Sequence, residues 1–154
     1  MLFQAHLFFA LALAYILKLP VKTAALAGVI PDLDTAFYAL GLPFPFMHRG
    51  ILHTPIILGV ILIGIYLATK RPDICAGFGV GFLSHLFIDT LNPTGIMWLY
   101  PVPTFFTLDL ATYSNAIANW GIVAWSAAFI LLFNLHFITK LDPRKLGAVL
   151  RGLK

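Results

Sequence analysis

The sequence has few charged residues, no glutamate and almost no cysteine. Only 10% of its 154 residues are charged, and all six acidic residues are aspartate. The single cysteine, Cys75, excludes an internal disulfide. With 60% hydrophobic residues and a mean hydropathy of +0.94, the composition excludes an ordinary soluble domain and predicts an integral membrane protein.

The basic residues give the chain a formal net charge of +4, which by itself could indicate a nucleic-acid partner. However, lysine and arginine occur in short clusters between and after hydrophobic segments. This is the pattern by which membrane topology is set. We therefore expect this chain to lie in a membrane and not to bind nucleic acid.

The hydrophobic segments predict an all-α fold, a membrane bundle of about five transmembrane helices. The expected spans are residues 1–17, 23–40, 54–69, 74–91 and 115–139. We expect residues 1–139 to form one transmembrane domain and residues 140–154 a basic cytoplasmic tail. The first segment lacks the basic start of a secretory signal, so we interpret it as a retained helix.

Three local features refine this bundle. Pro31 should break the second span, since proline removes a helical hydrogen bond. Thr54 followed by Pro55 predicts the start of the third helix. Residues 92–114 are too rich in proline for a span and too aromatic for a solvated linker, so they predict a long loop at the membrane interface.

His85 and Asp89 in the fourth span are the main candidates for function. Four residues apart on a helix, they lie on one face and can reach the same metal ion. Gly77 and Gly81 continue that row, so the same face can approach neighbouring helices closely. Because an ionisable residue costs about 2.5 to 3.5 kcal/mol at mid-membrane, the pair indicates a function.

Other histidines and aspartates are expected at the same end of the bundle. If the tail is cytoplasmic, alternating spans put every basic residue except Arg49 on the cytoplasmic side. The polar residues that then fall in the outer half or near mid-depth are His6, Asp32, Asp34, His48, His53, His85, Asp89 and Asp109. A cluster from four separate segments thus converges on one depth.

Imidazole and carboxylate groups without a nearby thiolate are typical of a hydrolytic zinc, manganese or iron site. We predict one or two divalent transition-metal ions, with zinc as first choice. The predicted ligands are His6, Asp32, His48, His53, His85 and Asp89. We expect Asp34 to be a ligand or general base, and Arg49 to bind a phosphate through two hydrogen bonds.

This ordered set of residues resembles the YdjM-like family of small membrane-bound, metal-dependent hydrolases. The residues that carry the resemblance lie between Met1 and Pro101: His6, Pro31-Asp32-Leu33-Asp34, His48-Arg49-Gly50, His53-Thr54, Gly81 to Asp89, Asn92-Pro93-Thr94-Gly95 and Tyr100-Pro101. That family is in turn similar to zinc-dependent phospholipases C and single-strand-specific zinc nucleases. The resemblance implies that His85 and Asp89 supply the helical His and acid pair of the metal site.

Together these features predict an enzyme of the inner (plasma) membrane. The expected reaction is hydrolysis of a phosphoester on a lipid or lipid-linked substrate, at a site facing the outer leaflet. A metal-ion transporter and a non-catalytic metal-binding scaffold are the alternatives. A transporter should also carry polar groups in the cytoplasmic half, where the sequence offers only Asp73, Cys75 and His136. Oligomeric state, head group and the choice between phosphatase and phospholipase cleavage stay open.

Overall fold

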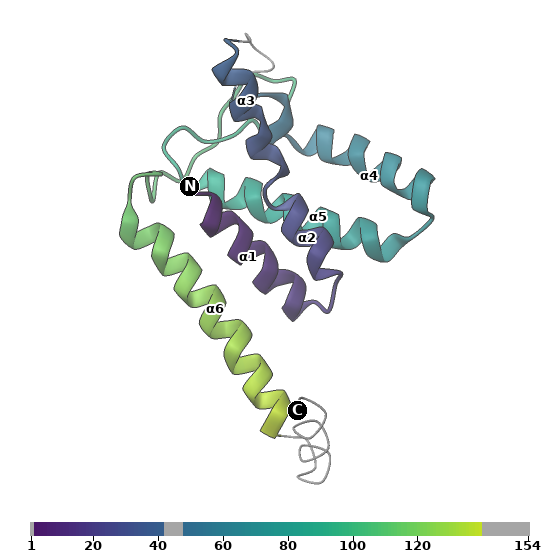
Figure 1. The fold of residues 1–154 in the computed structure, drawn as a ribbon. Coiled ribbons are helices and arrows are strands. Elements are labelled where there is room, and N and C mark those ends of the chain that lie inside the picture. Colours follow the sequence, from purple (N-terminus) through teal and green to yellow (C-terminus); the bar gives the residue numbers. More distant parts are fainter. Residues whose placement is uncertain (1, 42–47, 140–154) are drawn as a thin grey trace.

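The protein is described by a computed structural model that covers residues 2–41 and 48–139. Its helices are α1 (Phe3–Ile16), α2 (Val21–Ala27), the 3-10 helix η1 (Ile30–Leu33), α3 (Asp34–Ala39), the 3-10 helix η2 (Ile51–His53), α4 (Pro55–Thr69), α5 (Pro72–Thr90) and α6 (Ala116–Thr139). In these ranges the β-structure is limited to one isolated antiparallel bridge between Ile96 and Phe106. The predicted all-α class is confirmed (Figure 1). The predicted tail, residues 140–154, lies outside the described residues.

Helix α5 is the centre of the bundle. It packs against α1, α2 and α4, whereas α6 packs along the outer side of α1 (Figure 1). Phe82, Leu86 and Ile88 of α5 are almost completely buried, as are His85 and Asp89. The polar pair therefore lies inside the bundle and is enclosed by neighbouring helices.

The glycines of α5 allow α2 to come into backbone contact with it. A Cβ atom added at Gly81 would lie 2.1 Å from the carbonyl oxygen of Ala24 in α2, and one at Gly77 would lie 3.1 Å from the carbonyl oxygen of Pro20. No side chain larger than hydrogen fits at Gly81 without moving α2. The prediction that this row permits close helix approach is confirmed.

The second predicted span is broken around Pro31. Helix α2 ends at Ala27, and the chain then tightens into η1, which has Pro31 in its first turn. Helix α3 begins at Asp34. The break replaces one long helix with short ones, so that Asp32 in η1 and Asp34 at the start of α3 contact the buried residues His85 and His53.

The third predicted helix starts where the sequence indicates. Pro55 is the first residue of α4, and the side chain of Thr54 accepts a hydrogen bond of 3.4 Å from the backbone N–H of Ile57. This cap satisfies one of the free N–H groups at the helix start.

Residues 92–114 form the predicted irregular loop, and this loop folds back over the end of α5. Backbone N–H groups of Leu108 and Leu110 donate to the carbonyl oxygens of Thr90 and Leu91, at 2.8 and 2.9 Å. The indole N–H of Trp98 donates to Thr90 Oγ1 at 2.9 Å. Because the last carbonyls of a helix lack partners within it, these bonds fix the loop to the end of α5 that carries Asp89.

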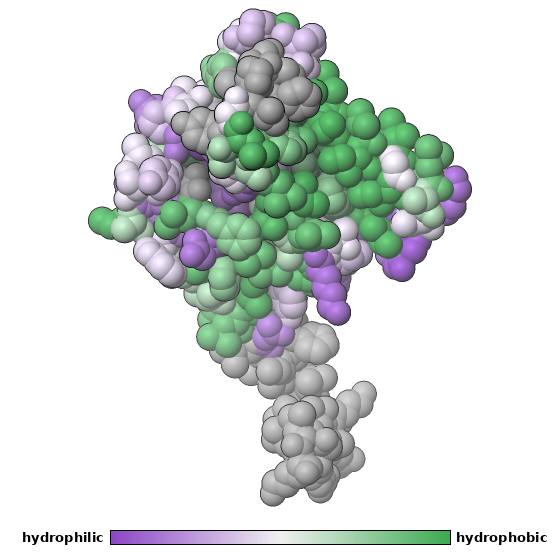
Figure 2. All heavy atoms as spheres, turned by 45° about the horizontal axis from the view of Figure 1, so that its top comes forward, coloured by the Kyte–Doolittle hydropathy of each residue, from purple (hydrophilic) through white to green (hydrophobic). Residues whose placement is uncertain are grey.

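Only one helix in the described ranges is by itself long and apolar enough to cross a membrane, α6 over Ala116–Asn134. Helices α1 and α4 are apolar but have 14 and 15 residues, or about 21 and 22 Å at about 1.5 Å per residue. Large hydrophobic side chains are nevertheless exposed in a stripe along α4, at Ile56, Val60, Ile63 and Leu67. Figure 2 shows the broad hydrophobic surface over that part of the molecule.

Candidate metal centre

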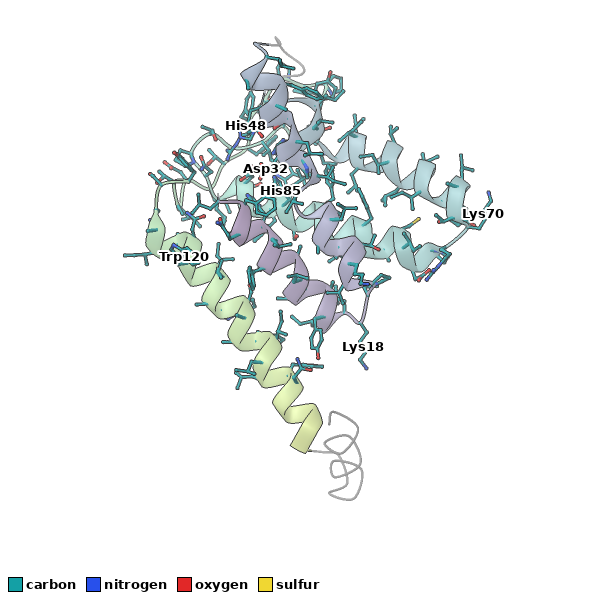
Figure 3. The ribbon with its side chains drawn as sticks, in the orientation of Figure 1. Lys18, Asp32, His48, Lys70, His85 and Trp120 are labelled. Atoms are coloured by element: carbon teal, nitrogen blue, oxygen red, sulfur yellow. The ribbon has the colours of Figure 1, made fainter. Side chains whose placement is uncertain are left out.

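The polar residues singled out by the sequence meet at one end of the bundle. They come from α1 (His6), η1 (Asp32), the start of α3 (Asp34), the segment before η2 (His48 and Arg49), η2 (His53) and α5 (His85 and Asp89). His6, His53 and His85 are fully buried, and Asp34 and Asp89 are 1% exposed. Lys18 and Lys70 lie at helix ends far from this cluster (Figure 3). The predicted convergence is confirmed.

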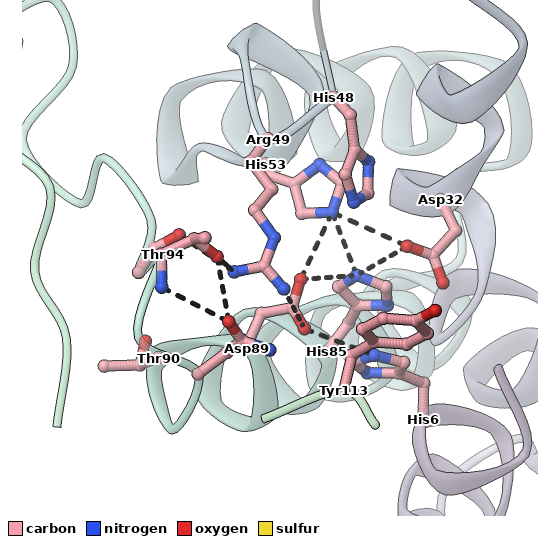
Figure 4. Close-up of polar contacts among 12 residues, drawn as sticks. His6, Asp32, His48, Arg49, His53, His85, Asp89, Thr90, Thr94 and Tyr113 are labelled. Atoms are coloured by element: carbon pink, nitrogen blue, oxygen red, sulfur yellow. Dashed lines mark hydrogen bonds and ion pairs between the residues drawn. The ribbon is translucent and has the colours of Figure 1, made fainter. Parts of the chain in front are cut away.

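Four donor atoms of this cluster form a compact tetrahedron (Figure 4). His53 Nε2 lies 3.1 Å from His85 Nε2, 3.5 Å from Asp89 Oδ2 and 3.8 Å from Asp32 Oδ1. His85 Nε2 lies 3.7 Å from Asp89 Oδ2 and 3.6 Å from Asp32 Oδ1. Around tetrahedral zinc, bonds of about 2.0 to 2.2 Å place neighbouring donors about 3.3 to 3.6 Å apart. These five distances are thus close to the spacing that such an ion requires, and the sixth, between the Asp32 and Asp89 donors, is within 4.8 Å.

The far side of each imidazole determines which ring nitrogen faces the cluster. His85 Nδ1 lies 2.8 Å from the carbonyl oxygen of Gly28, which can only accept, so Nδ1 donates and Nε2 carries the lone pair. His53 Nδ1 lies 2.8 Å from Asp34 Oδ2, and this carboxylate favours the same tautomer. Neutral His85 therefore directs an unprotonated Nε2 at the donor group, and the contact with Asp34 favours the same arrangement in a neutral His53.

Two carboxylates that face one another in a buried site repel, and Arg49 pairs with only the outer oxygen of Asp89. A divalent cation offsets this repulsion, and nitrogen and oxygen donors of this kind are ligands of zinc, manganese and iron. The residues Asp32, His53, His85 and Asp89 therefore fit a transition-metal ion.

Asp34 lies behind the tetrahedron and contacts three groups. Its Oδ1 accepts from His48 Nδ1 at 2.7 Å, and its Oδ2 accepts from the backbone N–H of Arg49 at 2.9 Å. Oδ2 also makes the 2.8 Å contact with His53 Nδ1. Both carboxylate oxygens are thus committed to orienting other site residues.

His6 packs against the tetrahedron from α1. Its ring stacks on that of His85 with centroids 3.8 Å apart, and its Nε2 lies 3.4 Å from Asp89 Oδ1. That oxygen is the one Asp89 directs away from His53 and His85. Neither ring nitrogen of His6 has a hydrogen-bond partner among the described residues. The structure thus places His6, a predicted ligand, at the edge of the four-donor group.

Arg49 is buried and connects the loop after α5 to Asp89. Its NH1 donates to Thr94 Oγ1 and, at 3.3 Å, to the carbonyl oxygen of Gly95, and its NH2 lies 3.2 Å from Asp89 Oδ1. The φ angle of Arg49 is 65°, a left-handed conformation that is uncommon for a residue with a side chain. The surrounding contacts hold this unusual backbone geometry and with it the guanidinium.

A cavity of about 990 Å³ opens beside the cluster. Asp32, His48 and Arg49 contribute polar groups to its wall, and Phe3 and Phe105 are among its apolar lining residues. Of the four tetrahedral donors, Asp32 is the one that lines the cavity, and its side chain is 23% exposed. Access to the candidate metal centre is therefore from the side of Asp32.

Some site contacts were not predicted from the sequence. The backbone carbonyl of Gly28 fixes His85, but a carbonyl leaves no signature in the residue type. Asn92 and Thr94 suggest only caps and turns, yet Asn92 Oδ1 accepts from Thr94 Oγ1 at 3.0 Å and Thr94 holds Arg49. The Asn92-Pro93-Thr94-Gly95 motif was the available signal for this part of the site.

The features described so far define a helical membrane protein with a buried histidine and aspartate centre. The chain belongs to the YdjM family, since the family described as YdjM inner membrane protein matches residues 1–149. Its curated relatives include the proteins called inner membrane protein YdjM in Escherichia coli (strain K12) and Shigella flexneri. Each is 29% identical over 104 residues, which cover 58% of this chain and 53% of the relative.

The chain thus spans about half the length of these relatives. No solved structure matches the chain. Membership of the family places the protein in a membrane and agrees with the resemblance on which the sequence prediction relied.

Proposed function

We propose that this protein is a membrane-embedded, metal-dependent hydrolase that cleaves a phosphoester of a lipid or lipid-linked substrate. One observation carries the proposal: two imidazole nitrogens and two carboxylate oxygens lie within 4.8 Å of one another beside a large cavity, and five of their six mutual distances are 3.1 to 3.8 Å. A transition metal bound there polarises a phosphoryl oxygen and lowers the pKa of a water molecule.

The larger of two donor groups supports one ion, with zinc as first choice, held by Asp32, His53, His85 and Asp89; the second group is Asp34, His48 and His53. Asp34 orients His48 and His53, so its role in this proposal is positioning. His6 packs against His85 and contacts the outer oxygen of Asp89, which orients that carboxylate. Hydrogen bonds behind the ligands commonly raise metal affinity and fix the ligand tautomer.

The cavity supports an amphipathic substrate. Its polar wall lies at Asp32, His48 and Arg49, and side chains such as Leu33 and Phe105 provide apolar surface. A volume of about 990 Å³ is at the upper end of typical small-molecule sites. A charged head group can therefore lie against the polar wall while an acyl or prenyl chain follows the apolar one.

Arg49 has donors left for a substrate phosphate. A guanidinium has five N–H donors, and in the described contacts NH1 uses two and NH2 uses one. The Nε–H and the second N–H of NH2 have no partner among the described residues. Because Arg49 lines the cavity and its orientation is fixed by Thr94 and Asp89, it can present these donors to an anion without reorganising.

In the proposed topology the hydrophobic segments cross the membrane about five times, with α2, η1 and α3 together replacing one regular span. The ends of α1 and α4 that carry Lys18 and Lys70 would lie on the cytoplasmic side, as would the C-terminus. The metal centre would then face the outer leaflet. Short helices such as α1 require the bilayer to thin locally or the site end to lie within the head-group region.

The alternative is a non-catalytic scaffold with a structural metal ion, and the number of protein donors is an argument for it. Four protein donors close the shell of a structural zinc ion, whereas catalytic zinc usually has three protein ligands and an open position. The exposure of Asp32 is an argument for the enzyme. Its side chain is 23% exposed on the cavity side, whereas His53 and His85 are completely buried, so a water molecule or substrate can replace Asp32 as a ligand.

The test is a hydrolysis screen with purified protein in detergent or lipid nanodiscs, using lipid phosphomonoesters and phosphodiesters. We expect turnover by wild type that is abolished in His85→Ala. Arg49→Gln should raise KM and lower kcat with its metal content unchanged, and Arg71→Gln, which changes an exposed arginine far from the cavity, should behave as wild type. A metal-loaded wild type that hydrolyses none of these substrates supports the scaffold instead.

A further inference from the structure

His48 differs from the other two histidines that surround Asp34 and the metal centre. Its side chain is 34% exposed and lines the cavity, whereas His53 and His85 are completely buried. It is also absent from the group formed by Asp32, His53, His85 and Asp89, although it forms a second group of possible donors with Asp34 and His53. In that second group its Nδ1 already lies at hydrogen-bond distance, 2.7 Å, from Asp34 Oδ1. The sequence prediction treats all three as equivalent ligands, so this difference needs a separate explanation.

The hydrogen bond to Asp34 determines which nitrogen of His48 is available. Asp34 Oδ1 is an acceptor 2.7 Å from His48 Nδ1, so in the neutral ring Nδ1 carries the proton and Nε2 the lone pair. Among the residues that the structure describes, nothing is hydrogen-bonded to this Nε2. His48 therefore has the arrangement of a proton acceptor whose tautomer is fixed by a carboxylate.

The ring is also held in a fixed position relative to the metal centre. Asp34 is 1% exposed and binds the backbone N–H of Arg49, the residue next to His48 in the chain. The rings of His48 and His53 meet edge to face, with centroids 5.2 Å apart and an interplanar angle of 85° (Figure 4). His48 thus packs against one proposed ligand, His53, and shares the wall of the cavity with another, Asp32.

We propose that His48 is not a metal ligand and instead accepts a proton during hydrolysis, a role that rests on the proposed function. His48 Nε2 takes a proton from the attacking water as the water oxygen bonds to phosphorus. The bond between phosphorus and the ester oxygen breaks, and that oxygen leaves with the electron pair. The leaving oxygen then takes the proton from the His48 imidazolium, which restores the neutral ring.

The first test measures whether metal protects each histidine from diethyl pyrocarbonate, which acylates unprotonated, uncoordinated imidazole nitrogens. Wild-type protein is labelled near neutral pH with zinc bound and after chelation, and the labelled peptides are identified by mass spectrometry. We expect His48, which is 34% exposed, to be acylated equally in both states, and the completely buried His53 and His85 to stay unlabelled in both. Protection of His48 by zinc, lost on chelation, would make it a ligand and overturn the proposal.

The second test compares His48→Gln with His53→Gln after cobalt substitution. We expect His48→Gln to keep the wild-type cobalt stoichiometry and visible absorption spectrum while kcat falls about 10²-fold or more. His53→Gln should lose the cobalt spectrum, and Asp73→Asn should match wild type in both measurements. A His48→Gln protein with wild-type kcat, or one with an altered cobalt spectrum, would contradict the proposal.

The two tests separate this inference from the hydrolase itself. If wild type binds metal but hydrolyses no phosphoester, the hydrolase proposal fails and the catalytic role of His48 fails with it. The labelling pattern and the cobalt spectrum still decide whether His48 lies outside the coordination shell.

Discussion

An arginine and aspartate pair lies at each end of helix α5, and the two pairs have different surroundings. At its start, Arg71 NH2 lies 2.6 Å from Asp73 Oδ2, and the two side chains are 62% and 47% exposed. At its end, Arg49 NH2 lies 3.2 Å from Asp89 Oδ1, with side chains that are 10% and 1% exposed. The pair with the shorter contact is the one in solvent.

This comparison shows that distance alone does not measure the importance of an ion pair. Water and counterions screen an exposed pair, so Arg71 and Asp73 contribute little even though hydrogen bonds from Arg71 hold the pKa of the Asp73 carboxyl below its usual range. Asp89 is buried and is shared among Arg49, His6, His53 and His85. Loss of one partner there leaves several groups without compensation.

The largest effect is expected for Asp89→Asn. The variant keeps the shape of the side chain but removes the negative charge that faces two imidazoles and Arg49. We expect metal affinity to fall by more than about 100-fold and the metal-free protein to lose about 3 to 5 kcal/mol of stability. Calorimetric metal titration and thermal unfolding in detergent measure both. The matched variant Asp73→Asn should change neither, and equal effects at the two sites would refute the comparison.

Asp34→Asn should have the next largest effect. The amide keeps one acceptor oxygen but cannot serve His48, His53 and the backbone of Arg49 as the carboxylate does. We expect metal affinity to fall by about 10- to 100-fold while the stoichiometry at saturating metal is retained. Complete loss of binding would instead identify Asp34 as a direct ligand, as the sequence alone allowed.

Gly81→Ala tests the contact between α2 and the part of α5 that lies between its two ends. The added methyl group would meet the backbone of Ala24, and α2 cannot move without shifting Gly28, whose carbonyl fixes His85. We expect a loss of about 1 to 3 kcal/mol in unfolding free energy, together with weaker metal binding. Gly64→Ala in α4 is the control, since nothing lies within 4 Å of its added Cβ. A Gly81→Ala protein as stable as the control would disprove the close α2 and α5 contact.

The smallest effect is expected for Arg71→Gln. Because Arg71 lowers the pKa of Asp73, the pair stabilises the fold above the ordinary aspartate pKa, and this contribution is lost as the pH falls through the lowered value. Because both side chains are largely exposed, solvent screening makes this contribution small, and the unfolding temperature should not shift measurably at neutral pH. A clear decrease in that temperature would show that the exposed pair matters more than its surroundings indicate.

Much of the fold follows from local sequence signals. Pro55 after Thr54 locates the start of α4, the charged run before Pro72 locates the turn into α5, and Pro31 locates the break in the second span. The four-residue spacing of His85 and Asp89 places both on the buried face of α5. These features depend on neighbouring residues alone, which is why sequence reasoning could find them.

The division of roles within the site depends on three-dimensional contacts that the sequence does not contain. His6, His48 and His53 are all histidines at the same expected depth, yet only His53 belongs to the tetrahedral group with His85. Asp32 and Asp34 are two residues apart, but η1 turns one towards the tetrahedron and the other towards His48. The geometry of an irregular segment between α2 and α3 decides this, and residue types do not specify it.

The most direct test of this account is the metal content of purified wild-type protein and His85→Ala, measured by inductively coupled plasma mass spectrometry. The account predicts one transition-metal ion per wild-type chain and almost none in a His85→Ala protein that keeps its helical circular dichroism spectrum. A wild-type protein that is folded and active without metal would contradict it.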